Sequence, residues 1–216
     1  MVIKIILKRV KSQIFFLNKV PKCALYQGAL FIHIPKAAGS KVSFDLYGAQ
    51  IGHHKAVSYY LNDYSNFKSI PTFSIVRNPI DRFISAYNFL KNGGMSKIDS
   101  IFNEEVLSKY NDINDFIKNE VNKSSFRLID VPHFEPQFEY LYYNSTLLVD
   151  FVFKLENLIQ DNNISDVFPM INELDFSKRA NATKGKGYTS KDLNSDSVSI
   201  LKNFYYKDYE VFGYEK

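Results

Sequence analysis

A short loop that carries a lysine and a glycine is the first stretch of the chain whose residues could do chemistry. It reads Pro35-Lys-Ala-Ala-Gly-Ser40 and follows an apolar run at residues 29–34. A loop that leads from a strand into a helix points backbone amides and the positive end of the helix dipole at one place, and Lys36 adds a full charge. These groups suit a phosphate or sulfate ion. The loop alone is equally compatible with an ordinary strand-to-helix turn, so further residues must decide.

The order of residues in this loop excludes the phosphate loop of nucleoside triphosphatases. That motif has a glycine, four other residues, and then Gly-Lys followed by Ser or Thr. Here the order is Gly39-Ser40-Lys41, and Ile34 stands at the position of the first glycine. No set of magnesium ligands is evident, and the sequence predicts no metal site.

Arg77 and Ser85 form a second candidate anion site. Arg77 directly follows a second apolar run, Thr72–Val76, and Ser85 lies about two helical turns further along the chain. A guanidinium group presents a planar fork of donors that matches a phosphate, and a serine hydroxyl adds another donor. The chain therefore offers two anion sites, each placed after an apolar run.

Strands that alternate with helices must position these residues. Apolar runs predict strands at 31–34, 72–76 and 150–155, and helical periodicity predicts helices at 40–47, 79–91 and 195–209, with a polar helical insertion at 95–130. This alternation indicates an α/β fold with a central, mostly parallel sheet flanked by helices. Ligands bind beyond the carboxyl ends of the strands in such sheets, so we expect Lys36 and Arg77 near the same edge.

Composition favours a single globular domain. The chain has 216 residues, 45% of them hydrophobic, which is enough for a substantial core. We expect residues 29–216 to form this domain. The net charge of +4 is too weak to argue for a nucleic-acid partner. The single cysteine, Cys23, excludes an internal disulfide and is compatible with a reducing compartment, so we expect a cytoplasmic protein.

Residues 1–28 are predicted to be a basic amphipathic extension. Within residues 1–20, apolar residues recur at helical spacing between lysines and arginines. The longest apolar run there, Ile14–Leu17, is too short to cross a bilayer and lacks the centre of a signal peptide. A helix packed on the domain is the preferred interpretation. The alternative is a membrane-surface anchor, which would make the protein peripheral to a membrane.

Five stretches in order along the chain resemble one enzyme family. Residues 34–40 and 76–87 resemble the cofactor motifs of sulfotransferases that use 3′-phosphoadenosine 5′-phosphosulfate (PAPS). Residues 133–137, 153–157 and 206–214 are similar to elements of the carbohydrate branch, that of heparan sulfate 2-O-sulfotransferase and its bacterial relatives. The resemblance covers almost all of the chain after residue 28. It implies a P-loop-like sulfotransferase fold and transfer of a sulfuryl group to a hydroxyl of a saccharide or polysaccharide.

The resemblance also implies the residues that hold the nucleotide. Lys36, Gly39 and Ser40 would hold the 5′-phosphosulfate, and Arg77 with Ser85 would hold the 3′-phosphate. Further candidates for nucleotide contacts are Ala38, Lys41, Lys184 and Lys186, the last two in a basic loop that would cover the nucleotide. Lys41 departs from the family pattern, which commonly has Ser or Thr at this position. The substitution loses a hydroxyl contact and gains a charge.

The catalytic base is expected to be a histidine. Gly52-His-His-Lys-Ala56 resembles the family's Gly-His-x-x-Ala segment, and that spacing selects His53. A histidine suits this part because its unperturbed pKa is near neutrality. His54 is the alternative base and also a candidate for contact with the acceptor. Lys36 would stabilise the negative charge that builds on the leaving phosphate oxygen.

His133, Gln137 and Glu156 are the remaining candidates for the acceptor site. His133 and Gln137 lie in a stretch that resembles the family's His-x-x-Pro-Gln element. His133 has a second interpretation, in which it ties down a loop, and Glu156 could instead form an ion pair. His33, inside a predicted strand, is expected to be structural, and Arg82 is expected to make surface contacts near the start of a helix.

Two other classes of protein remain as alternatives. One is a non-catalytic nucleotide- or glycan-binding protein on the same fold. The other is an ATP-dependent small-molecule kinase, which the order of Gly39-Ser40-Lys41 disfavours. No residue encodes a particular sugar, so the sequence leaves the identity of the acceptor open.

Overall fold

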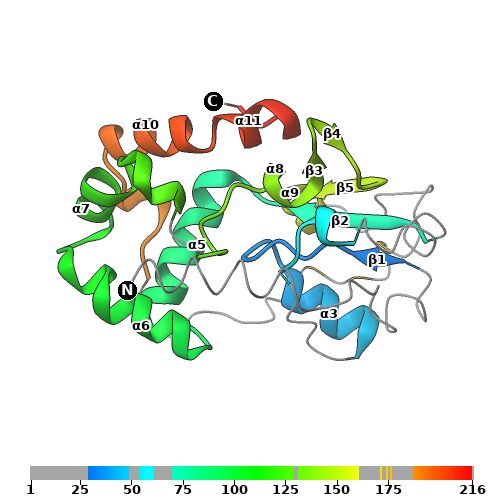
Figure 1. Ribbon diagram of the computed structural model, residues 1–216, viewed down its shortest axis with the longest axis horizontal. Helices are drawn as coiled ribbons and strands as arrows, with labels where there is room; N and C mark the ends of the chain where they lie inside the picture. The colour runs from blue at the N-terminus through cyan, green and yellow to red at the C-terminus, as the bar shows by residue number, and fades with distance from the viewer. Residues whose placement is uncertain are drawn as a thin grey trace. The chain divides into compact units, whose positions relative to one another are not determined.

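The computed structural model describes residues 29–48, 54–60, 70–128, 131–160, 171, 174, 176 and 187–215 (Figure 1). The chain divides into two compact units, each assembled from segments that are distant in sequence. The unit that contains residues 79–136 and 183–216 is called the helical unit below, and the unit that contains residues 16–78 and 137–182 is called the sheet unit. Each unit is described separately.

A parallel sheet is the centre of the sheet unit. Its strands are β1 (Leu30–Phe31), β2 (Thr72–Val76) and β5 (Phe151–Lys154), in the spatial order β1-β2-β5. All pairings are parallel, and every residue of the middle strand β2 is buried. A parallel strand that is covered on both faces favours apolar residues, as in Phe73, Ile75 and Val76. The two polar residues of β2 are buried with their hydroxyls bonded, Thr72 to Asp150 and Ser74 to the carbonyl oxygen of Ile32. The expected α/β class with a parallel sheet is confirmed.

In its described residues, the sheet unit also contains three helices, of which α9 follows its strand, β5, without a loop. They are α3 (Gly39–Tyr47), α8 (Phe138–Leu141) and α9 (Leu155–Gln160), with a 3₁₀ turn at Val57–Tyr59 and a small antiparallel hairpin of β3 (Tyr142–Tyr143) and β4 (Thr146–Leu147). Val42 and Leu46 are one turn apart on α3 and belong to the same buried cluster as Phe73 and Ile75 of β2. Burial of this apolar face fixes α3 beside the sheet.

A carboxylate joins the start of β2 to the start of β5. Asp150 accepts hydrogen bonds from the backbone N–H of Thr72, at 2.8 Å, and from its hydroxyl, at 2.7 Å. The Thr72 hydroxyl in turn accepts from the N–H of Asp150 at 2.9 Å. These residues are 78 positions apart, so the contact sets the register between two strands that no short turn connects.

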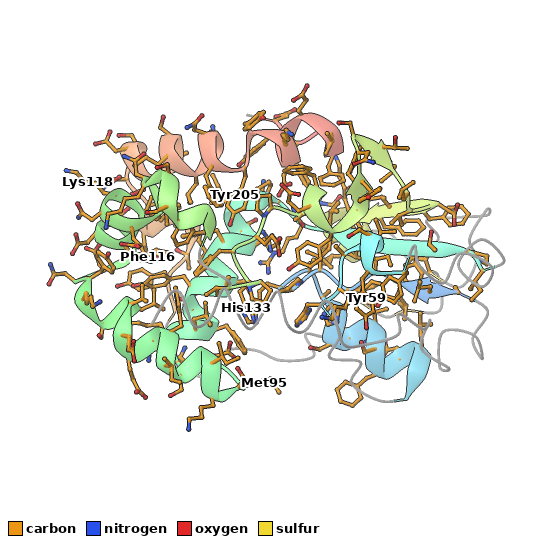
Figure 2. The ribbon with its side chains drawn as sticks, in the orientation of Figure 1. Tyr59, Met95, Phe116, Lys118, His133 and Tyr205 are labelled. Atoms are coloured by element: carbon orange, nitrogen blue, oxygen red, sulfur yellow. The ribbon has the colours of Figure 1, made fainter. Side chains whose placement is uncertain are left out.

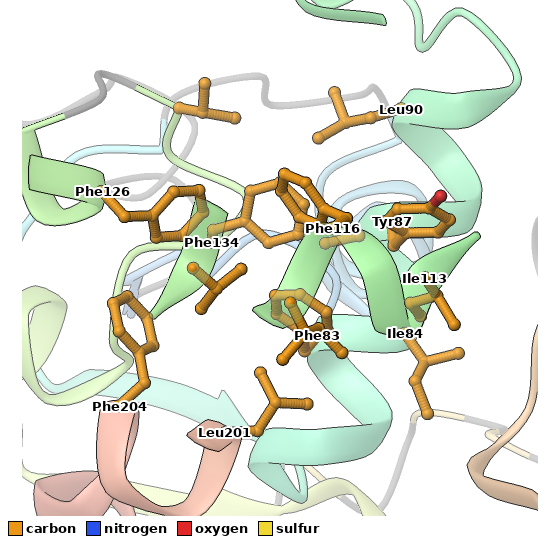
Figure 3. Close-up of a cluster of buried hydrophobic side chains, with 14 of the residues drawn as sticks. Phe83, Ile84, Tyr87, Leu90, Ile113, Phe116, Phe126, Phe134, Leu201 and Phe204 are labelled. Carbon is orange, nitrogen blue, oxygen red and sulfur yellow. The ribbon is translucent and has the colours of Figure 1, made fainter. Parts of the chain in front are cut away.

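The helical unit contains a large aromatic core. Its main helices are α5 (Pro79–Lys91), α6 (Lys97–Glu105), α7 (Ile113–Phe116), α10 (Ser195–Phe204) and α11 (Tyr206–Phe212). Shorter helical turns lie at Leu107–Lys109, Ile117–Val121, Ser124–Leu128 and Ser190–Asp192. Phe83 and Phe134 have ring centroids 4.9 Å apart, and Phe116 lies 5.8 Å from Phe126 (Figure 3). Tilted and edge-to-face contacts of this kind stabilise the core beyond the area that they bury.

Helix α5 begins and ends as the sequence predicts. Pro79 occupies its first position, where a missing N–H costs nothing. Phe83, Tyr87 and Leu90 lie on one face and are buried. After Lys91 the chain turns through Gly93, whose φ of 87° is a left-handed conformation that favours glycine.

The expectation for Arg82 was wrong, because this residue is completely buried on α5. Its guanidinium donates to the carbonyl oxygen of His133 at 3.1 Å and also to that of Glu135. The hydroxyl of Tyr205 donates to the carbonyl between them, that of Phe134, at 2.8 Å. A buried loop must find donors for its carbonyls. Arg82 and Tyr205 supply them to three successive residues, and this explains why a charged side chain is inside.

Among the described residues, no helix has the length and apolar character needed to cross a membrane. The predictions for residues 1–28 lie outside the described part of the chain.

Candidate functional site

The loop between β1 and α3 has the geometry of an anion cradle. Lys36 and Ala38 both adopt left-handed backbone conformations, with φ of 65° and 64°. Such conformations are strained for residues with a Cβ and concentrate at functional sites. Ala38 is the N-cap of α3 and has no side-chain acceptor, and the first turn of the helix contains no acidic residue. The amides at the start of α3 are therefore directed at a place that suits a negatively charged ligand.

His33 borders this loop, which the sequence did not indicate. Its side chain is 5% exposed, and a Cβ added to Gly39 would lie only 1.8 Å from its Nε2 atom. The imidazole also stacks on Phe31, with ring centroids 5.4 Å apart. Gly39 is therefore required because a ring lies against its Cα. His33 was expected to have a structural role, and this contact agrees with that expectation. The sequence did not predict that His33 lies beside the anion loop.

A second histidine lies against His33. The rings of His33 and His54 meet edge to face, with centroids 4.3 Å apart, and Nδ1 of His54 is 3.4 Å from the carbonyl oxygen of His33. A proton on Nδ1 that is directed at a carbonyl leaves Nε2 as the atom that can accept a proton. The structure thus brings one of the two candidate bases to the loop, while His53 lies outside the described residues.

Arg77 contacts the loop from the neighbouring strand. It directly follows β2, and its Nη1 atom donates to the carbonyl oxygen of Lys36 at 3.4 Å. The structure thus brings Lys36 and Arg77 together, as expected for residues that follow neighbouring parallel strands.

The side chains of Gln137 and Glu156 bond the backbone that follows β2. Nε2 of Gln137 donates to the carbonyl oxygen of Arg77 at 2.8 Å, and its Oε1 accepts from the N–H of Arg77 at 2.9 Å. Glu156 accepts from the N–H of Asn78 at 2.6 Å. Both side chains were expected to contact an acceptor, and that expectation stays a prediction. What the structure adds is their contact with the turn that carries Arg77.

Lys41 has a partner on its own helix. Its ammonium group forms an ion pair with Asp45, one turn further along α3, and both side chains are partly exposed. Part of the charge that Lys41 adds to the loop region is therefore balanced within α3. Ser40, on the first turn of α3, is half-buried.

In the helical unit, α5 holds the end of the predicted basic loop. Asn88 donates to the carbonyl oxygen of Tyr188 at 2.8 Å and accepts from its N–H at 2.9 Å. A Cβ on Gly187 would come within 2.8 Å of the Asn88 side chain, so the chain approaches α5 closely here. Ser85 is half-buried one turn before Asn88 on the same helix. Lys184 and Lys186 precede this anchor but lie outside the described residues.

His133 is held within the helical unit (Figure 2). It is 8% exposed, its Nδ1 atom lies 3.9 Å from a carboxylate oxygen of Asp99, and its ring lies 5.0 Å from that of Phe89. Arg82 bonds its carbonyl oxygen. These contacts agree with the interpretation in which His133 ties down a loop.

The described residues of the loop region suit an anionic ligand. In the sheet unit, a strained loop, an uncapped helix start and the cations Lys36 and Arg77 come together without an acidic side chain on the first turn of α3. Ser85, His133 and the anchor at Asn88 belong to the helical unit and are described apart from them. Within the described ranges, no group of three His, Cys, Asp or Glu side chains could hold a metal ion.

Comparison with known proteins agrees with this geometry. A family model described as the sulfotransferase family matches residues 27–215 of the chain. No curated protein and no solved structure matches the chain. The match includes both strand-to-helix loops as well as the segments that hold Gln137, Glu156 and Tyr188.

Proposed function

The chain belongs to the sulfotransferase family, and from this premise we propose that it uses PAPS to sulfate a saccharide or polysaccharide hydroxyl. In this reaction the acceptor oxygen forms a bond to sulfur, and the bond between sulfur and the phosphate oxygen breaks. The products are a sulfate ester and 3′-phosphoadenosine 5′-phosphate (PAP). The observation that carries the proposal is the contact of Arg77 with the Lys36 loop, because it joins two anion-binding elements at one sheet edge.

The proposal assigns the two anionic ends of the nucleotide to different residues. Lys36, Gly39 and Ser40 bind the 5′-phosphosulfate at the start of α3, supported by the helix dipole and by the left-handed turns of the loop. Arg77 and Ser85 bind the 3′-phosphate. The segment with Lys184 and Lys186 covers the nucleotide, and the bonds between Asn88 and Tyr188 fix its downstream end to the helix that carries Ser85.

Residues of the chain supply charge stabilisation and proton transfer. The bound nucleotide provides the sulfuryl group and a phosphate leaving group. Lys36, which is half-buried, stabilises the negative charge that develops on the leaving oxygen. A histidine accepts the proton of the acceptor hydroxyl, which is a weak nucleophile while protonated.

The choice of the base lies between His53 and His54. The resemblance selects His53, whereas the contact of His54 Nδ1 with the His33 carbonyl supports the tautomer of His54 in which Nε2 is the proton acceptor. We keep His53 as the proposed base. The variant His53→Ala should bind PAP normally and lose sulfuryl transfer. If His53→Ala transfers sulfate normally and His54→Ala does not, then His54 is the base.

A nucleotide-binding experiment tests the donor. A ligand at about one hundred times its dissociation constant stabilises a protein by about 2.7 kcal/mol. We expect PAP to raise the melting temperature more than ATP with Mg²⁺ does, because the proposed site offers a second anion position for the 3′-phosphate. Equal or reversed shifts would contradict the PAPS assignment and favour the kinase alternative.

Transfer of labelled sulfate tests the reaction itself. The assay supplies labelled PAPS with a panel of bacterial polysaccharides and their precursors, and we expect label in at least one of them. Binding of PAP without transfer to any member would favour the non-catalytic alternative. We also propose that the protein is cytoplasmic. Contact of residues 1–20 with a membrane surface is the alternative.

A further inference from the structure

We propose that Gln137 and Glu156 are positioning residues for the nucleotide, acting through the backbone of Arg77 and Asn78. Their contacts with this turn are called the backbone clamp below. The inference rests on the proposed function, since it takes Arg77 to hold the 3′-phosphate. It assigns Gln137 and Glu156 to the nucleotide site, whereas the sequence suggested the acceptor site.

The Gln137 side chain forms hydrogen bonds with the backbone of Arg77, the first residue after β2. Strand β2 ends at Val76, and the next residue, Arg77, finds its backbone partners in the carboxamide of Gln137. A carboxamide offers a donor and an acceptor side by side, which matches the N–H and C=O of a single extended residue. Gln137 is fully buried, where an amide is stable only with its hydrogen bonds made.

Glu156, on α9, forms a hydrogen bond with the backbone of the next residue, Asn78. It lies in the first turn of α9, directly after β5, which pairs with β2. Its Oε1 atom accepts from the N–H of Asn78 at 2.6 Å, and a hydrogen bond to an ionised acceptor is about twice as strong as a neutral one. Asn78 precedes Pro79, which already restricts its backbone. Three of the backbone groups in this turn are thereby fixed by two side chains.

Fixing the backbone determines where the guanidinium of Arg77 can reach. The Arg77 side chain is half-buried, and its Nη1 atom bonds the carbonyl of Lys36 at 3.4 Å. A planar fork binds a phosphate well only when its orientation is set. A shift of the Arg77 backbone would move the fork away from the loop. The clamp therefore controls affinity for the 3′-phosphate without touching the nucleotide.

Binding of two nucleotides that differ only in the 3′-phosphate tests the inference. The variants are Gln137→Met, which keeps the length and removes both hydrogen-bonding atoms, and Gln137→Glu, which keeps an acceptor and removes the donor. Dissociation constants for PAP and for adenosine 5′-phosphate are measured by calorimetry on the full chain. We expect both variants to weaken PAP binding by about tenfold or more, the effect of one disrupted hydrogen bond to a charged group. Binding of adenosine 5′-phosphate should change by less than about twofold, within the error of such comparisons.

A matched variant at the other end of β2 separates positioning from general stability. Thr72→Val removes a buried hydroxyl that donates to Asp150 at 2.7 Å. We expect it to lower the melting temperature and to keep the wild-type preference for PAP over adenosine 5′-phosphate. If Thr72→Val loses this preference as strongly as Gln137→Met does, the loss reflects general destabilisation rather than positioning of Arg77, and the inference is overturned.

Variants of Glu156 keep the inference testable where Gln137→Met does not fold. Glu156→Ala removes the acceptor and should reduce the preference for PAP, and Glu156→Gln should restore part of it because its amide oxygen still accepts from Asn78. Retention of the full preference in Glu156→Ala would contradict the clamp. A raised KM for the acceptor with unchanged PAP affinity in the Gln137 variants would return Gln137 to the acceptor site.

The outcome for the wild-type protein distinguishes the two proposals. If the wild-type chain binds PAP no better than adenosine 5′-phosphate, the donor assignment itself fails. If the wild type prefers PAP and the Gln137 and Glu156 variants prefer it equally, the donor assignment stands and only the clamp is wrong.

Discussion

The imidazole of His33 occupies the space that a side chain on Gly39 would need. The Nε2 atom would lie 1.8 Å from a Cβ at that position, far inside van der Waals contact. His33 lies between β1 and the anion loop, and Gly39 is the first residue of α3. The two residues therefore restrict one another, and the shape of the loop depends on both.

Gly39→Ala should destabilise the protein by about 1–3 kcal/mol, the usual cost of overpacking a buried site. It should also weaken PAP binding, because the start of α3 must move to make room. The free energy of unfolding in urea measures the first effect. Adding His33→Ala should recover part of the loss, since it removes the ring that the new methyl group meets. Strict additivity of the two substitutions would contradict the contact.

Gly48→Ala is the control for this pair. Gly48 follows α3 with a φ of 65°, and an added Cβ would meet no atom within 4 Å. Its cost, about 1–2 kcal/mol, comes from the left-handed backbone alone. It should therefore be the same with and without His33.

Two buried tyrosines of the helical unit should respond differently to the same substitution. The hydroxyl of Tyr205 donates to the carbonyl of Phe134 at 2.8 Å, whereas the buried hydroxyl of Tyr87 has no hydrogen-bond partner in the described part of the chain. Tyr205→Phe should lower the free energy of unfolding by about 1 kcal/mol. Tyr87→Phe should leave it unchanged or raise it, because it removes an unsatisfied polar atom. Equal losses, measured by urea denaturation, would contradict this assignment.

Stability should fall in alkaline solution. Burial, with smaller contributions from Asp81 and Asp208, raises the pKa of Tyr209 from 10.0 to about 12, and burial also raises the pKa of Tyr87. The folded state thus holds protons that the unfolded chain releases near pH 10. The stabilisation is complete below that pH and is lost as the pH rises toward the folded pKa.

Denaturant titrations between about pH 9 and pH 12 measure this loss, because they span the unfolded and folded pKa values of tyrosine. Tyr209→Phe should show a shallower fall than the wild type. The same slope in both proteins would mean that Tyr209 does not contribute.

Asn88→Ala should weaken nucleotide binding as well as stability. The substitution removes both hydrogen bonds to the backbone of Tyr188, at about 1 kcal/mol each, and frees the end of the segment that carries Lys184 and Lys186. Asn92→Ala is the matched control, since Asn92 is exposed directly after α5 and its side chain donates to the carbonyl oxygen of Asn88, one turn earlier. Calorimetry with PAP compares the two. Equal affinity in Asn88→Ala and the wild type would contradict a part for this anchor in nucleotide binding.

The sheet and the ends of α5 could be predicted because local sequence determines them. A continuous apolar run at Thr72–Val76 is typical of a middle parallel strand, and it is one. Pro79 and Gly93 mark the ends of a helix through their own backbone preferences. The meeting of Lys36 with Arg77 followed from the rule that parallel strands present their carboxyl ends at one edge.

The partners of buried polar side chains could not be predicted in the same way. Arg82 lies on a helix with charged neighbours, and nothing in its surroundings in the sequence shows that carbonyls some fifty positions later will need its donors. Gln137 and Glu156 have side chains that suit an acceptor equally well, and only the fold shows that they bond the turn after β2. These contacts depend on which distant segments meet, which no periodic pattern encodes.

The separation of the paired strands has a consequence for synthesis of the chain. During synthesis, β2 can pair with β1 as soon as both strands have emerged, as in the pairing of Leu30 with Thr72. The other edge of β2 pairs with β5, so it has no partner until Phe151 has been synthesised. Until then that edge presents unpaired backbone N–H and C=O groups, and such edges are common starting points of aggregation. The turn that carries Arg77 also lacks Glu156 until β5 has emerged. A chain that stops before Phe151 should therefore aggregate more than the full chain, and the fraction found in inclusion bodies measures this.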